Sequence, residues 1–122
     1  MTCAEARSRV RAALQPLCET LPPRQATLLV QDACLVTSEL VTNALLHGAG
    51  VRDFDVGVRG TALTIRVGDH STDPPTPRAP APAVPGGNGW IIIRRLAAEI
   101  TIEPDAAGKT ISVVLDAARM AA

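Results

Sequence analysis

The stretch from Ser38 to Gly48 carries the side chains best suited to chemistry in this chain. Glu39, Asn43 and His47 are spaced four residues apart, so on a helix they share one face. A glutamate can accept a proton from an attacking hydroxyl. An asparagine offers a neutral oxygen to Mg²⁺, which takes few ligands from proteins and the rest from phosphates and water. The pattern suits phosphoryl transfer, although a polar stripe on an otherwise buried helix shows the same spacing.

Two further patterns point to a nucleotide. Asp69 ends an apolar strand, where its carboxylate could accept a hydrogen bond from an adenine amino group or, alternatively, start a turn. Gly86-Gly87-Asn88-Gly89 stands directly before a helical segment, and a glycine backbone at a helix start can approach phosphates closely. Flexible punctuation after a loop explains the glycines equally well. Each pattern alone is weak evidence for a nucleotide site. The order of the patterns along the chain therefore has to distinguish a nucleotide site from ordinary turn and loop residues.

Periodicity predicts the elements that position these residues. Apolar residues recur at helical spacing over residues 4–18 and again over residues 24–47, and the second segment stops before Gly48. From residue 51 to residue 67 the period is two, which predicts a β-hairpin. Residues 90–99 are predicted to form a third helix, and a second hairpin follows, with strands around residues 100–102 and 111–115.

Residues 70–88 contain six of the ten prolines and no apolar period, which predicts a long loop. Such a loop inside a compact domain is usually functional. The remaining elements predict a single α/β domain over residues 1–122, of the α+β kind. It is expected to be a two-layer sandwich in which three helices cover one face of a mainly antiparallel sheet. The alternating strands argue against a doubly wound parallel sheet, whose strands are apolar throughout.

Composition narrows the classes of function. Twelve basic and twelve acidic residues cancel, with no basic run, so no nucleic-acid partner is expected. No apolar stretch approaches the roughly 18 residues that cross a bilayer, so we expect no membrane partner and a cytoplasmic location. The three cysteines are odd in number and lack metal-ligand spacing, which favours reduced thiols without a functional role.

The motifs taken together resemble the GHKL (histidine-kinase-like) ATPase superfamily, which has a Bergerat-type ATP-binding fold. The resemblance covers nearly the whole chain. It rests on a helix with Glu-x-x-x-Asn, a strand ending in Asp, a long loop, Gly-x-Gly opening a helix, and Gly108-Lys109-Thr110 entering a strand. The segments SELVTNALLHG and GGNGWIIIRRLAAEITIEPDAAGKTISVVL are most similar to anti-sigma factor serine/threonine kinases and their stand-alone ATP-binding relatives.

The resemblance implies ATP and Mg²⁺ as cofactors and assigns roles to particular residues. It implies Glu39 as the catalytic base, Asn43 as the Mg²⁺ ligand and Asp69 as the adenine contact. It also implies that Gly87 and Gly89 lie at the phosphates.

Further roles follow from the same resemblance. Thr110 would support the adenine contact, and residues 70–88 would form a lid over the nucleotide. Within this lid Arg78 could reach a phosphate, or carry a solvated loop charge. His47 is interpreted as structural, because a histidine at a helix end can interact with the last carbonyls.

The resemblance also implies partners: a sigma factor, and an anti-anti-sigma (antagonist) protein that is phosphorylated. A homodimer stays open. The alternative is a non-catalytic ATP-binding regulatory module of the same fold. A sensor-kinase catalytic domain ranks last, since no histidine-bearing pair of dimerisation helices precedes the motifs. The glycines of the family's Asp-x-Gly-x-Gly are replaced by Ser71 and Asp73, and Trp90 stands where relatives usually have leucine. Loss of the two glycines favours the module, whereas retention of both Glu39 and Asn43 favours the enzyme.

Overall fold

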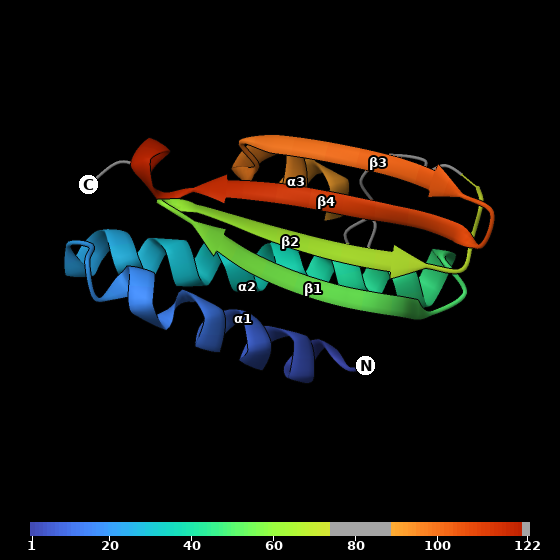
Figure 1. Ribbon diagram of the computed structural model, residues 1–122, viewed down its shortest axis with the longest axis horizontal. Coiled ribbons are helices and arrows are strands. Elements are labelled where there is room, and N and C mark those ends of the chain that lie inside the picture. The colour runs from blue at the N-terminus through green and yellow to red at the C-terminus, as the bar shows by residue number, and fades with distance from the viewer. Residues whose placement is uncertain (74–88, 121–122) are drawn as a thin grey trace.

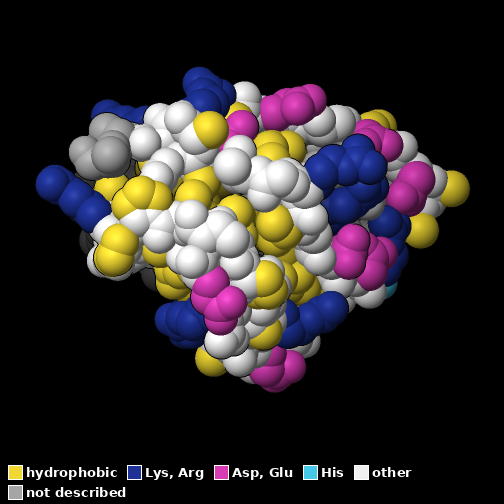
Figure 2. Space-filling model, turned by 60° about the vertical axis from the view of Figure 1, so that its left-hand side comes forward, with side chains coloured by type: hydrophobic (Ala, Val, Ile, Leu, Met, Phe, Trp, Pro, Cys, Tyr) yellow, Lys and Arg dark blue, Asp and Glu magenta, His cyan; other side chains and the backbone are white. Residues whose placement is uncertain are grey.

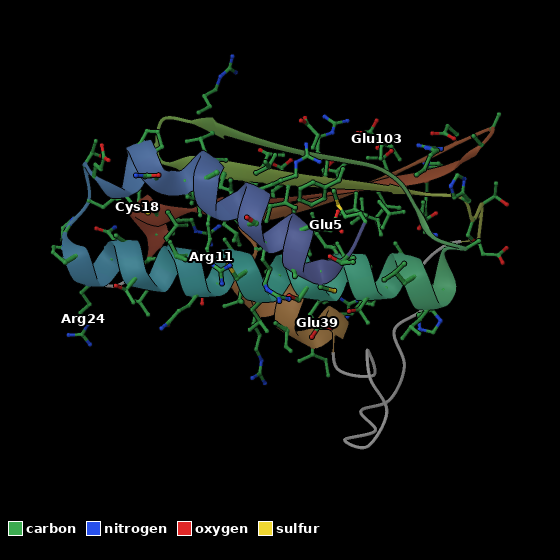
Figure 3. The ribbon with its side chains drawn as sticks, turned by 90° about the horizontal axis from the view of Figure 1, so that it is seen from below. Glu5, Arg11, Cys18, Arg24, Glu39 and Glu103 are labelled. Atoms are coloured by element: carbon green, nitrogen blue, oxygen red, sulfur yellow. The ribbon has the colours of Figure 1, made fainter. Side chains whose placement is uncertain are left out.

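The computed structural model describes residues 1–73 and 89–120, and in these ranges it has two layers. A four-stranded sheet forms one layer, and the helices α1, α2 and α3 lie together on one of its faces (Figure 1). Figure 3 shows the two layers edge-on, with the sheet above the helices, and the long α2 packs against both α1 and α3. The predicted two-layer α+β sandwich is confirmed.

Capping and turn residues set the ends of the first two helices. The side-chain oxygen of Thr2 caps α1 (Cys3–Cys18) by accepting a hydrogen bond from the backbone N–H of Glu5 at 3.1 Å. A proline at the first position opens α2 (Pro23–His47), where a missing N–H costs nothing. After α2 the chain turns through Ala49 and Gly50, which both have positive φ.

The sheet is antiparallel throughout, in the order β1-β2-β4-β3. Its residue alternation places apolar side chains against the helices, because successive side chains of a strand point to opposite faces. A short 3₁₀ helix, η1 (Ala117–Arg119), follows the last strand. The strands are β1 (Val51–Arg59), β2 (Ala62–Asp69), β3 (Glu99–Asp105) and β4 (Gly108–Asp116).

The core lies between α2 and the inner face of the sheet. From α2 it receives apolar side chains three or four residues apart, which form one stripe of the helix. The strands contribute every second residue. Prominent members of this core are Leu29, Val36, Leu40, Ile65, Val113 and Leu115.

One predicted boundary is wrong. The third helix, α3 (Gly89–Leu96), was expected to continue to residue 99, but Glu99 already belongs to β3 and pairs with Val114. The helix stops because the backbone N–H of Ala98 donates a 2.7 Å hydrogen bond to the carbonyl of Val114. This N–H therefore pairs with β4, and not with the carbonyl of Arg94 as a continued helix would require. The two predicted hairpins are confirmed.

Charged side chains on the face in Figure 2 are of both signs and are interspersed with apolar ones. In the described part of the chain no helix is both long enough and apolar enough to span a bilayer. Most of the predicted lid, residues 74–88, lies outside the described residues.

The core packing gives a first prediction. Leu40 is almost fully buried under the sheet, whereas Leu46 on the same helix is 55% exposed. Leu40→Ala should lower the free energy of unfolding by about 2–5 kcal/mol, because it removes buried methyl groups and leaves a cavity. Leu46→Ala, the matched control, should stay within about 0.5 kcal/mol of the wild type. Urea denaturation measures both, and equal effects would contradict the assignment of the buried face of α2.

Candidate nucleotide-binding site

A small pocket lies between α2 and the start of α3, and it joins residues fifty positions apart in the sequence. Its lining consists of Glu39 and Asn43 from α2, and Gly89, Trp90 and Ile93 from α3. Figure 3 labels Glu39 on α2, where that helix meets α3. The fold therefore brings Glu39 and Asn43 together in space with the glycine that opens α3, which the order of the motifs in the sequence alone could not show.

The carboxylate of Glu39 lies in the space that a side chain at position 89 would take. A Cβ atom added at Gly89 would lie 2.5 Å from Oε2 of Glu39, well inside van der Waals contact. Any larger residue there would displace the carboxylate. Gly89 thus keeps an acidic oxygen at the N-terminal end of α3, where the helix leaves backbone N–H groups without intrahelical partners.

Burial raises the pKa of Glu39 above its ordinary value, because the partly dry surroundings disfavour the charged carboxylate. Among the described residues no Lys or Arg forms an ion pair with it. A general base works best when its pKa lies near the operating pH, so this shift is in the useful direction.

Asp69 lies at the end of β2 and is almost completely buried. Its Oδ2 atom forms an ion pair with Nζ of Lys109 at 2.9 Å, and the two side chains are only 2% and 5% exposed. Its Oδ1 atom accepts a 2.9 Å hydrogen bond from the backbone N–H of Ser71. A Cβ added at Gly48 would lie 2.6 Å from Oδ2, so the end of α2 also presses on this carboxylate.

Thr110 does not lie beside Asp69. In the β2–β4 register Asp69 pairs with Lys109, and Thr110 pairs with Gly68, so Thr110 points to the opposite face of the sheet. There its hydroxyl accepts a 3.3 Å hydrogen bond from Nη2 of Arg52. The role of Thr110 in adenine binding stays a prediction, and this geometry does not favour it.

Lys109 is the β4 side chain that the motif analysis missed. The signal was present in the sequence, because Ile111, Val113 and Leu115 are the inward residues of this strand and period two extends the same face to Lys109. The motif Gly108-Lys109-Thr110 had drawn attention to the threonine instead.

The remaining candidates fall into two groups. His47 is exposed at the end of α2 and lines no described pocket with Glu39 and Asn43, and its structural role stays a prediction. Arg78 and Gly87 lie outside the described residues, so their predicted phosphate contacts stay predictions.

The described residues fit a nucleotide with its metal ion. Gly89 brings the backbone at the start of α3 close to Glu39, and Asn43 offers a neutral oxygen in the same pocket. Asp69 supplies a carboxylate at the end of β2. Within residues 1–73 and 89–120 no cluster of three or more His, Cys, Asp or Glu side chains could hold a metal ion. Magnesium does not need one, because phosphates and water complete its shell.

The helix-covered antiparallel sheet, with a pocket between α2 and α3, defines an α+β domain. A family model described as the histidine kinase-like ATPase domain matches residues 2–115, and the chain belongs to this family. Domains of this family bind ATP, usually with Mg²⁺. No curated protein matches the chain. The predicted membership of the GHKL superfamily is thereby confirmed.

The raised pKa of Glu39 predicts how stability depends on pH. At pH values between the ordinary pKa of a glutamate, about 4.5, and the raised pKa of Glu39, this side chain binds more protons in the folded protein than in the unfolded chain. Stability therefore falls as pH rises through this interval, and Glu39→Gln removes that loss. The variant should be more stable than the wild type at pH 7, and the difference should vanish as pH falls below about 4.

Denaturation series at several pH values measure this difference. Glu103→Gln is the matched control, because it removes an exposed carboxylate from β3. A gain in Glu39→Gln that does not depend on pH would show that a cause other than proton binding at Glu39 is responsible.

Proposed function

We propose that this protein is an anti-sigma factor-type serine/threonine protein kinase that binds ATP and Mg²⁺ and regulates transcription by partner switching. In this function it phosphorylates a serine or threonine of an anti-anti-sigma (antagonist) protein. It sequesters a sigma factor through a separate, non-catalytic interaction, in the cytoplasm. The observation that carries the proposal is the pocket in which Glu39 and Asn43 face the glycine start of α3.

Each residue of this pocket has a role in the proposed reaction. Asn43 is the Mg²⁺ ligand, and the bound ion offsets the charge of the phosphates. Glu39 accepts the proton of the substrate hydroxyl while the oxygen of that hydroxyl forms a bond to the γ-phosphorus of ATP. The bond between this phosphorus and the bridging oxygen breaks, and ADP leaves with that oxygen. Gly89 receives the phosphates at the N-terminal end of α3, where backbone N–H groups favour anions.

Other contacts complete the proposal. Asp69 accepts a hydrogen bond from the adenine amino group. Gly87 and Arg78, both outside the described residues, contact phosphates, and residues 70–88 form the lid over the nucleotide. A homodimer is compatible with this function but does not follow from it.

The second candidate function is a non-catalytic ATP-binding regulatory module. A specific observation favours it: both oxygens of Asp69 already have partners, Lys109 and the backbone of Ser71, and Ser71 replaces the first glycine of the family motif. A base can use the remaining lone pairs of this carboxylate, but it comes into contact with Ser71, so nucleotide binding is coupled to a backbone change beside the site. In the module the nucleotide orders a partner-binding surface without phosphoryl transfer.

Phosphoryl transfer separates the two candidates. With γ-labelled ATP, Mg²⁺ and candidate antagonist proteins from the same genome, the wild type should label an antagonist on serine or threonine. Glu39→Gln should lower the rate roughly a hundredfold or more, because it removes a general base, while ATP affinity stays within several fold. Glu103→Gln should transfer label at the wild-type rate. Tight ATP binding without transfer to any antagonist would favour the module.

Metal dependence tests Asn43. Asn43→Ala should weaken ATP binding measured by calorimetry with Mg²⁺, and should have little effect when Mg²⁺ is chelated, because only the metal contact is lost. Gln31→Ala, which removes an exposed amide from the same helix, should change neither titration. Equal losses of affinity with and without Mg²⁺ would show that Asn43 is not the metal ligand.

A further inference from the structure

Lys109 is an unusual residue in this protein. It is the single lysine among twelve basic residues, the other eleven being arginines, and its side chain is only 5% exposed. Burying an ammonium group is costly unless it is paired and hydrogen-bonded, and an apolar residue would serve the core at least as well. The position therefore calls for an explanation beyond packing.

In the described part of the chain the ammonium group of Lys109 has two acceptors. It can donate three hydrogen bonds, and two of them go to Oδ2 of Asp69 at 2.9 Å and to the carbonyl of Ser71 at 3.3 Å. Among the described residues the third has no acceptor. Within residues 1–73 and 89–120 Asp69 accepts hydrogen bonds only from Lys109 and from the N–H of Ser71, although a carboxylate can accept about four.

The two side chains are held side by side by the backbone around them. Cross-strand pairing of β2 with β4 sets Asp69 opposite Lys109. Gly48 and Gly108 both press against Asp69, so closely that an added Cβ would clash at either position. The chain therefore presents an acceptor and a donor in a fixed order at one end of the sheet.

We propose that Lys109 is a specificity-determining residue of the nucleotide site, donating a hydrogen bond to N1 of adenine while Asp69 accepts one from the 6-amino group. This inference rests on the proposed function. Adenine presents a donor, the amino group, next to an acceptor, N1, which is the complement of carboxylate beside ammonium. Guanine presents the reverse, O6 beside N1–H, so it would set acceptor against acceptor and donor against donor.

The hydrogen bond to Ser71 is the one that the base replaces. At 3.3 Å it is the longer of the two lysine contacts, and it comes from a partly exposed residue between His70 and Thr72, both of which are exposed. The ion pair with Asp69 can stay intact during this exchange. A base that lacks N1 leaves the buried ammonium short of an acceptor, which is how a polar site rejects a near-isosteric ligand.

The test compares ligands as well as variants, using calorimetry on the full chain with Mg²⁺. The wild type should bind 1-deaza-ATP, in which a C–H replaces N1, roughly 10- to 100-fold more weakly than ATP, the scale of a hydrogen bond from a charged donor. Lys109→Met should bind ATP and 1-deaza-ATP equally. It should still prefer ATP over purine riboside triphosphate, which lacks the 6-amino group and so tests Asp69 alone.

Arg66→Met is the matched control, since Arg66 is an exposed β2 cation that points to the other face of the sheet. It should keep the wild-type ratio of affinities. If Lys109→Met does not fold, the double variant Asp69→Asn/Lys109→Met removes both charges together and should also bind the two ligands equally.

Two outcomes would overturn the inference, and they can be told apart. Equal affinity of the wild type for ATP and 1-deaza-ATP would remove Lys109 from base recognition while leaving ATP binding in place. No detectable binding of ATP to the wild type would overturn the proposed function and this inference with it.

Discussion

The packing of α2 against the inner face of the sheet is the constraint on which the rest of the structure depends. One stripe of this helix, including Leu29, Val36 and Leu40, fills the core. Helical geometry then fixes where Glu39 and Asn43 point, because they lie on the same helix at a set angle from that stripe. They are directed toward α3, which packs beside α2. Burial of the apolar stripe of α2 therefore determines the direction in which the side chains of Glu39 and Asn43 point.

The sequence predicted the layers, the hairpins and the shared face of Glu39 and Asn43 on α2. Each of these depends on the spacing of residues along a short segment, which can be read from one sequence. The prediction extended α3 too far, because a hydrogen bond between Ala98 and Val114 ends that helix, and a contact across sixteen residues leaves no local pattern. Boundaries of this kind are set by competition between a helix and a sheet for the same backbone N–H.

At the neighbouring strand end, sequence reasoning named Asp69 and not its partner. The ion pair with Lys109 depends on cross-strand register, which is fixed only once β2 and β4 are aligned. Period two within β4 placed Lys109 on the inner face, yet only the assembled sheet sets it opposite the aspartate. The result is a charged pair at the rim of an apolar core, where the fold accepts a desolvation cost. Such costs are often found at functional sites.

The residue next to Gly89 has a practical consequence. Trp90 lines the same pocket as Glu39 and Asn43, and the chain has no second tryptophan and no tyrosine. Nearly all of the protein's intrinsic ultraviolet fluorescence therefore originates at one indole ring beside this pocket. The emission of that ring depends on the polarity and hydration of its surroundings, so the wild-type chain carries its own optical reporter at this position. Changes in the pocket can be followed in real time without attaching a dye.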